Sequence, residues 1–268
     1  MKKIYAGIAS VVLLLAIGWW FLWPRPIARP DYVPRTVALR SDKFYVYPPQ
    51  GTMRGTIIFF GNDVGFWQPH QELADFLSRD GYAVVGFDLR SLFTSVANLA
   101  PADRENIVGD SLSVLMFECL AEFHGEKLPL VLMGHSLGAE VSIWASSHIG
   151  VPKIDGVVAM APGGRGHLAI TASDYLSSSL PSGPDSFSMS QLVSSAPRTV
   201  RIALVRGTAD KMGAADPGIL AAGASRMKSF PIPLAGHSLK KILIARYVVR
   251  DALGWVLAPQ TEARRAGN

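Results

Sequence analysis

Two copies of the tetrapeptide GHSL each place a histidine next to a serine, the residue types that nucleophilic catalysis uses. The first copy spans Gly134–Leu137 and the second spans Gly236–Leu239. A serine hydroxyl becomes a good nucleophile only when a base within hydrogen-bond reach takes its proton. The sequence therefore raises the question of which serine and which histidine could work together.

The first copy extends to GHSLG at 134–138, a G-x-S-x-G pattern. Residues 128–133 read as a buried strand and 137–148 as a helix, so Ser136 would lie on the sharp turn that a nucleophile elbow requires. The two glycines fit this turn because a Cβ would collide with neighbouring backbone. We expect Ser136 to be the nucleophile and the Leu137 N–H to be one oxyanion donor. The competing interpretation is a plain tight turn.

The second copy lacks the second glycine, since Lys240 stands in its place. Ser238 is therefore expected to cap a helix over 238–257. His237 lies between the last expected strand and this helix, after the serine and the acid, as the order Ser, acid, His requires. We expect His237 to be the base, against the alternative of a solvated loop histidine. His135 is expected to point away from the serine and to pack beside the elbow.

The acid and the second oxyanion donor are each left with two candidates. Asp210 directly follows the expected strand at 201–205, and Asp216 lies six residues further on. The acid must orient the imidazole from the end of that strand, which favours Asp210 over Asp216. The second donor is expected to be the backbone N–H of Asn62 or of Asp63, in a glycine-flanked loop. No metal site and no cofactor are implied.

Apolar runs alternate with helical patterns along most of the chain. Several runs are continuously apolar, which is typical of strands buried on both faces of a parallel sheet. The alternation predicts an α/β fold with a doubly wound, mostly parallel sheet. The expected strands cover 43–47, 55–60, 82–87, 128–133, 156–161, 201–205 and 228–232. The expected helices lie near 68–79, 101–124, 137–148, 217–224 and 238–257.

The domain organisation follows from shifts in composition. We expect one α/β domain over 36–258, with a Ser-, Gly- and Pro-rich insertion at 163–198 that is too long for an ordinary connection. It is interpreted as a lid or substrate-binding insertion, or else as a disordered surface loop. A proline-rich linker is expected at 24–35 and a flexible tail at 259–268. Residues 1–23 are interpreted as a signal anchor, and we expect them to form one transmembrane helix.

The anchor prediction is based on an uncharged apolar run from Ile4 to Trp23, long enough to span about 30 Å as a helix. Three tryptophans gather at its far end, as in an interfacial aromatic belt. A cleaved signal peptide is the competing interpretation. In a bacterium, Lys2 and Lys3 favour a single-pass orientation in the inner membrane with the α/β domain in the periplasm.

Composition excludes several other classes of protein. The chain has 268 residues, of which 49% are hydrophobic and 18% charged, so it is not disordered. Its formal charge is +5, but the basic residues form no cluster with aromatics, so nucleic acid is not an expected partner. Cys119 is the single cysteine, which excludes a disulfide framework and a thiolate metal site.

Three motifs together resemble the α/β-hydrolase superfamily over roughly 40–257: GHSLG at the expected elbow, GTAD at 207–210, and GH at 236–237. A narrower resemblance, to the bacterial VirJ/AcvB-type virulence proteins, lies in IIFFGNDVGFW, GYAVVGFDLRSLF and VLMGHSLGAEV. This loop, GNDVGFW, departs from the SGDGGW-like loop of that family. The resemblance implies an α/β-hydrolase fold and, through that family, hydrolysis of a lipid ester such as aminoacylated phosphatidylglycerol.

Two functions are therefore expected from the sequence. The first is a membrane-anchored periplasmic serine hydrolase that cleaves an ester, with a small-molecule or lipid ester as substrate. The second is a catalytically inactive protein of the same fold that serves as a binding or secretion-assisting module.

Overall fold

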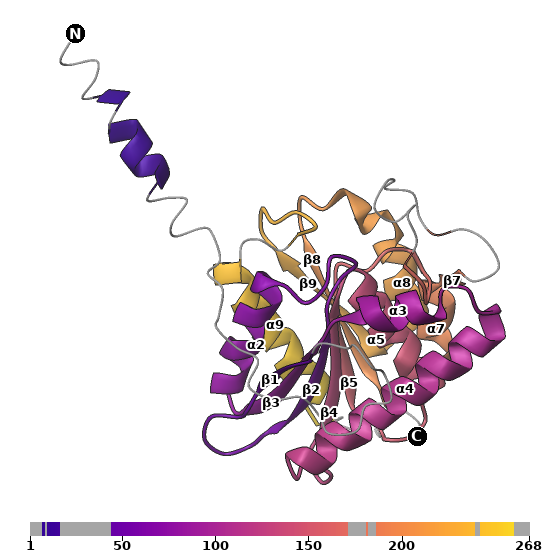
Figure 1. Cartoon of the computed structure of the whole chain (residues 1–268). Coiled ribbons are helices and arrows are strands. Elements are labelled where there is room, and N and C mark those ends of the chain that lie inside the picture. The colour runs from indigo at the N-terminus through magenta and orange to yellow at the C-terminus, as the bar shows by residue number, and fades with distance from the viewer. Residues whose placement is uncertain are drawn as a thin grey trace, which may run out of the picture.

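A seven-stranded sheet forms the centre of the part of the chain that the structure describes (Figure 1). The computed structural model describes residues 7–8, 10–16, 44–170, 181, 186–238 and 242–259. The strand order is β1-β3-β2-β4-β5-β8-β9, and every neighbouring pair is parallel except β1 with β3. The strands are β1 (Phe44–Tyr47), β2 (Gly55–Phe60), β3 (Tyr82–Phe87), β4 (Leu130–His135), β5 (Gly156–Met160), β8 (Arg201–Gly207) and β9 (Met227–Ile232).

Strand β2 shows why several of these strands are continuously apolar. All six of its residues are buried. Ile57 and Phe59 belong to the hydrophobic core on one face of the sheet, and Ile58 and Phe60 to the core on the other. Successive side chains of a strand point to opposite faces, so a sheet covered on both faces needs apolar residues at every position.

Helices cover both faces (Figure 1). Helices α2 (Gln68–Arg79) and α9 (Ile242–Leu257) pack on one face. The opposite face is covered by α3 (Leu89–Val96), α4 (Pro101–Glu122), α5 (Leu137–His148), α7 (Met189–Ser195) and α8 (Asp216–Gly223). The predicted doubly wound, mostly parallel sheet is confirmed, and each predicted strand lies within two residues of an observed one.

Helix α3 was absent from the sequence-based prediction. It is only eight residues long, and Asp88 caps it by accepting a hydrogen bond from the Arg90 N–H. Its buried residues, Leu89, Leu92 and Phe93 among them, follow a helical spacing. The pattern was thus present in the sequence, but it covers only two turns, which is too short to stand out from a loop.

The insertion expected at 163–198 is described only in part. Strands β6 (Arg165–Gly166) and β7 (Phe187–Ser188) pair antiparallel, and α7 follows directly. Helix α7 buries Met189, Leu192 and Val193 in the core beside α5. This end of the insertion is therefore a packed helix, whereas residues 171–180 and 182–185 lie outside the described residues.

Most of the expected N-terminal anchor also lies outside the described residues. Residues 7–8 and 10–16 are helical, and the remainder of 1–23 is not described. Within the described part of the chain, no helix is both long and apolar enough to cross a bilayer. The expected linker at 24–35 and residues 260–268 of the expected tail are likewise not described.

Candidate active site

Ser136 lies on a strained turn between β4 and α5. Its backbone has φ 54° and ψ −118°, a conformation that costs a non-glycine residue of order 1–3 kcal/mol. Strand β4 ends at His135 and α5 begins at Leu137, so a single residue makes the whole reversal. The turn therefore presents the serine side chain at the carboxyl edge of the sheet.

Both glycines of GHSLG are required by close backbone packing. A Cβ added to Gly134 would lie 2.0 Å from the carbonyl oxygen of Gly138, and one added to Gly138 would lie 2.3 Å from that of Gly61. Real Cβ atoms do not approach backbone this closely. The second contact also packs the elbow against the end of β2, which brings the loop at 61–65 beside Ser136.

The structure brings together the serine of the first GHSL copy and the histidine of the second. The distance from Ser136 Oγ to His237 Nε2 is 3.0 Å, and that from His237 Nδ1 to Asp210 Oδ2 is 3.1 Å. A carboxylate only accepts hydrogen bonds, so the His237 Nδ1–H donates to Asp210. Nε2 is then the acceptor for the serine hydroxyl. This tautomer is the one that a general base needs.

Asp210 rather than Asp216 is the carboxylate that contacts His237. Asp216 instead forms a two-pronged ion pair with Arg206, at 2.9 Å from Nε and 2.6 Å from Nη2. Arg206 Nη1 also donates to Asp210 Oδ2, at 2.7 Å. Arg206 thus holds both candidate acids, and only Asp210 reaches the imidazole.

The charge on Asp210 is stabilised by its neighbours. Burial works against that charge, but hydrogen bonds from Arg206, the Met212 N–H and His237 offset the cost and lower the pKa of Asp210. Arg206 is also buried, yet the carboxylates of Asp216 and Asp210 raise its pKa. Asp210 therefore stays ionised at neutral pH and can stabilise an imidazolium on His237.

The expected oxyanion donors differ in whether their N–H groups already have a hydrogen-bond acceptor in the protein. The Leu137 N–H is the first of α5 and has no acceptor among the described residues, as expected at a helix start. The Asn62 N–H makes a 3.3 Å hydrogen bond to the Gly65 carbonyl within its own loop. The Asn62 side chain accepts from the Val64 N–H at 3.2 Å. The second donor, Asn62 or Asp63, stays a prediction.

Comparison with solved structures identifies the fold. A soluble variant of monoglyceride lipase from Saccharomyces cerevisiae matches with a TM-score of 0.58 at 15% identity, over 85% of this chain and 98% of that one. Dienelactone hydrolase from Anabaena variabilis matches with a TM-score of 0.58 at 17% identity, over 87% and 96% of the two chains. The chain has the α/β-hydrolase fold.

A third structure, a serine hydrolase without a lid from Xanthomonas campestris, matches with a TM-score of 0.58 at 16% identity, over 88% of this chain and all of that one. No protein-family model matches the sequence, and no curated protein matches it either. At these identities the likeness shows the α/β-hydrolase fold, and the chemistry has to be argued from the site itself.

Three charged or polar residues lie at or beside the candidate site, and none of them was predicted to take part in it. Arg206 pairs with Asp210, as described above. Glu140, which is buried, accepts a hydrogen bond from the Gly163 N–H at 2.9 Å and so holds the loop after β5. His70 contacts His135 at 3.0 Å. Arg206 could have been noticed as a charge directly after the apolar run at 202–205, but nothing in the sequence pairs His70 with His135.

His135 does pack beside the elbow, as expected, and it also makes two hydrogen bonds there. Its Nδ1 lies 3.0 Å from His70 Nε2, and its Nε2 lies 2.8 Å from the carbonyl oxygen of His237. The histidine of the first GHSL copy is therefore bonded directly to the backbone of the second.

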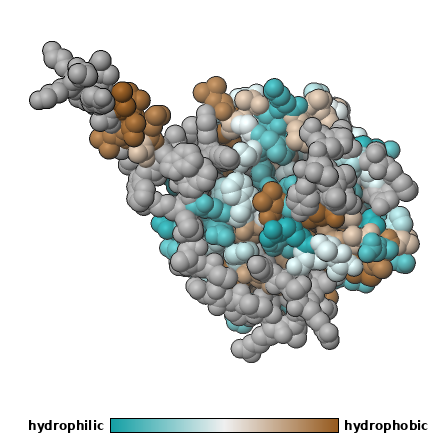
Figure 2. Space-filling model, turned by 45° about the horizontal axis from the view of Figure 1, so that its top comes forward, coloured by the Kyte–Doolittle hydropathy of each residue, from teal (hydrophilic) through white to brown (hydrophobic). Residues whose placement is uncertain are grey.

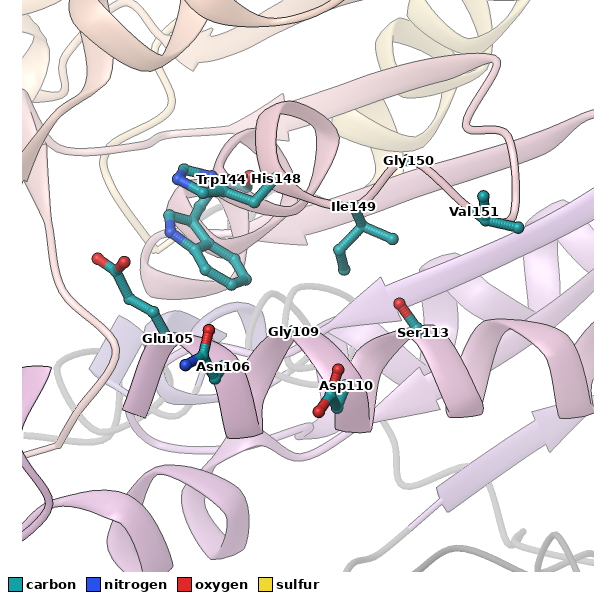
Figure 3. A pocket seen from close by; sticks show the side chains of 10 residues that line it. All are labelled: Glu105, Asn106, Gly109, Asp110, Ser113, Trp144, His148, Ile149, Gly150 and Val151. Atoms are coloured by element: carbon teal, nitrogen blue, oxygen red, sulfur yellow. Dashed lines mark hydrogen bonds between the residues drawn. The ribbon is translucent and has the colours of Figure 1, made fainter. Parts of the chain in front are cut away.

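A separate groove lies at the other end of α5 (Figure 3). Its volume is about 390 Å³, and its walls come from α4, the last turn of α5 and the segment that follows. Trp144 and His148 stack in it with ring centroids 4.6 Å apart. None of Ser136, Asp210 and His237 lines this groove, so it is distinct from the candidate active site.

Proposed function

We propose that this protein is a serine hydrolase that cleaves carboxylic esters. The observation that carries the proposal is the continuous set of contacts from Ser136 through His237 to Asp210, at 3.0 and 3.1 Å, on a strained elbow. Nucleophile, base and orienting acid stand in the relation that acyl transfer needs.

The chemistry proceeds in two steps. Ser136 Oγ attacks the ester carbonyl while His237 Nε2 takes its proton, and Asp210 stabilises the imidazolium that results. The tetrahedral oxyanion is held by the Leu137 N–H and by a second N–H from the loop at 61–65. His237 then gives the proton to the departing alcohol, which leaves an acyl group on Ser136. Water, deprotonated by His237, releases the acid.

Fluorophosphonate labelling tests the proposal. Wild-type protein should form one covalent adduct, located on Ser136 by mass spectrometry of peptides, and should hydrolyse simple acyl esters. Ser136→Ala should form no adduct. Ser238→Ala is the matched control, because it removes the serine of the other GHSL copy and should label at the wild-type rate. An unlabelled wild-type protein without esterase activity would instead support a non-catalytic binding or secretion-assisting module.

The substrate is proposed to be a lipid ester. Three apolar side chains protrude from the segments that follow β2, β8 and β9 at the carboxyl edge of the sheet, where the site lies: Val64 is 55% exposed, Met212 37% and Leu234 76%. Hydrophobic residues are interspersed with hydrophilic ones on the side of the molecule seen in Figure 2. Exposed apolar side chains at the same edge of the sheet as a polar site suit a substrate whose acyl chains are packed in a membrane or micelle.

A location at the bacterial inner membrane, with the α/β domain in the periplasm, completes the proposal. Its support is the apolar sequence from Ile4 to Trp23 and the resemblance to the VirJ/AcvB-type proteins. Membrane fractionation of cells expressing the full chain tests the location, with a chain lacking residues 1–23 as the control. Recovery of a shortened protein in the soluble periplasmic fraction would contradict the anchor and favour a cleaved signal peptide.

Activity on esters of different chain length tests the substrate class. The rate should rise with acyl length and should rise further above the concentration at which the substrate aggregates. Leu234→Ser should reduce this rise without affecting a water-soluble short-chain ester. Equal rates on monomeric and aggregated substrate would contradict the lipid ester while leaving the hydrolase itself intact.

A further inference from the structure

A buried chain of hydrogen bonds runs beneath the base. The Trp67 N–H lies 3.3 Å from His70 Nδ1. His70 Nε2 lies 3.0 Å from His135 Nδ1, and His135 Nε2 lies 2.8 Å from the carbonyl oxygen of His237. The chain thus links the start of α2, the end of β4 and the loop between β9 and α9.

The two ends of the chain determine where each proton lies. A carbonyl oxygen only accepts, so His135 Nε2 must carry a hydrogen, and its Nδ1 is then the acceptor in a neutral ring. His70 Nε2 must therefore donate to His135. The remaining nitrogen of His70, Nδ1, accepts from the Trp67 N–H. Each of the three bonds then has one donor and one acceptor, and all three point the same way, toward His237.

The surroundings keep both rings neutral and in place. His70 is 3% exposed and His135 2% exposed. Burial lowers the pKa of His135 to about 4. Burial together with the neighbouring His135 holds the pKa of His70 well below its ordinary value, against the Gly65 backbone, whose hydrogen bond with the ring acts in the opposite direction. His70 is also packed against the rings of Phe59 and Phe66, each with a centroid 5.4 Å away. An added proton would place two donors face to face, so the neutral state is the one that completes the chain.

We propose that His135 and His70 are positioning residues for His237, holding its backbone so that its ring stands between Ser136 and Asp210. The proposal rests on the proposed function, because the role of His237 as base comes from it. His135 directly precedes Ser136 in the chain. One residue of this pair therefore supplies the nucleophile, and the side chain of the other holds the backbone of the base. A shift in one is passed to the other.

Without the hydrogen bond from His135, the backbone of His237 would lose a contact that fixes its position relative to Ser136. Asp210 would still orient the ring but could not by itself hold the distance to Ser136. Misplacement of a reacting group by about 1 Å can cost about 100-fold in rate. The effect should appear in every step that uses the base and not in substrate binding.

Kinetics of three variants test the role. His135→Phe keeps an aromatic ring and removes both hydrogen bonds, so kcat should fall by about 10- to 100-fold with KM changed by less than about threefold. His70→Phe removes only the outer bond and should cost less. His135→Gln retains a donor of similar reach and should regain most of the rate. His148→Phe, on the far end of α5, is the matched control and should match the wild type.

Fluorophosphonate labelling rates of the folded variants separate positioning from loss of structure. Labelling depends on the same base, so it should slow by the same factor as kcat for each variant, while the fraction of protein that finally labels should stay close to one. A folded His135→Phe protein with wild-type kcat and labelling rate would overturn the positioning role. A wild-type protein that never labels would instead overturn the proposed function.

Nitrogen NMR of histidine-labelled wild-type protein tests the chain without any substrate. His70 and His135 should both show a protonated Nε2 and an unprotonated Nδ1 at pH 7, and both should remain neutral at pH 5.5. In His135→Phe, the ring signals of His237 should shift or broaden, whereas in His148→Phe they should not. A protonated Nδ1 on either buried ring, or unchanged His237 signals in His135→Phe, would overturn the proposal even if no variant is active.

Discussion

The two GHSL copies share four letters but differ in how tightly the backbone around them is packed. A Cβ on Gly134 would lie 2.0 Å from a backbone oxygen, whereas one on Gly236 would meet none of the described residues within 4 Å. Ser136 has φ 54°, held by packing against the end of β2, while Ser238 lies in a turn without such a conformation. The first copy is an elbow because its surroundings enforce one, and the second copy has no such surroundings.

The histidines of the two copies differ in the opposite way. His135 is 2% exposed and contacts His70 and the His237 carbonyl, whereas the side chain of His237 is 31% exposed and lies between Asp210 and Ser136. A base has to reach the substrate and exchange its proton with it, so partial exposure suits His237. A short motif therefore acquires its role from the contacts around it, and the two copies form one site between them.

The largest expected effect is on kcat, when the serine of the first copy or the histidine of the second is removed. Ser136→Ala and His237→Ala should each lower kcat by about 10⁴- to 10⁶-fold, since they act as one unit. The double variant should be no slower than either single one. Ser238→Ala, its serine being outside the triad, should keep wild-type kcat. Steady-state kinetics on one activated ester measure all four, and a slow Ser238→Ala would assign the second serine a role in the reaction.

The next effect separates the two aspartates. Asp210→Asn should lower kcat by about 10⁴-fold, because an amide cannot hold the required tautomer or stabilise the imidazolium. Asp216→Asn should cost far less, since Asp216 contacts Arg206 and not His237. Measured kcat values for the two variants check the assignment. If the order of the two losses were reversed, Asp216 would be the acid in solution.

Local sequence patterns were sufficient to predict most of the sheet and the serine, aspartate and histidine that the fold brings into contact. Apart from β9, the parallel strands contain continuous apolar runs, so their positions could be read from the sequence. The order Ser136, Asp210, His237 follows from the positions of their loops at the carboxyl edge. Asp210 was favoured over Asp216 because it lies closest to the end of its strand, and in the structure it contacts the imidazole at 3.1 Å.

Contacts between distant segments could not be predicted in this way. His70 and His135 are 65 residues apart, and their bond depends on how α2 docks against β4. Arg206 could be seen as a charged residue, but its pairing with both aspartates depends on the fold of the turn that follows β8. Helix α3 was missed because two turns give too few apolar positions to decide. The supporting groups of the site were thus harder to predict than the triad.

Substitution of the first glycine of each copy, Gly134 or Gly236, should change the free energy of unfolding by different amounts. Gly134→Ala should reduce the free energy of unfolding by about 3 kcal/mol or more, because the added carbon overlaps backbone that cannot move away. Gly236→Ala should change it by less than about 0.5 kcal/mol, since the site is open. Urea unfolding of both variants measures this. Equal losses would mean that the second copy is also tightly constrained.

The smallest effect concerns the pH dependence that the buried histidine confers. The pKa of His135 is lowered from 6.5 to about 4, chiefly by burial, so the unfolded chain takes up a proton at a pH where the folded protein does not. Stability should therefore be complete above pH 6.5 and should fall between pH 6.5 and 4, by about 3 kcal/mol for this residue. His70 acts in the same direction, and Asp210, whose pKa is lowered, stays ionised throughout this range.

His135→Gln isolates that contribution, because glutamine keeps a donor toward His237 and does not titrate. The variant should lose less stability than the wild type between pH 6.5 and 4, and its free energy of unfolding should approach that of the wild type as the pH falls. His148→Gln, the control, alters an exposed histidine and should follow the wild-type curve. Urea unfolding at pH 7, 5.5 and 4 gives the three curves. Parallel curves for His135→Gln and the wild type would mean that folding does not lower the pKa of His135, which would contradict a ring held neutral by burial in the chain to His237.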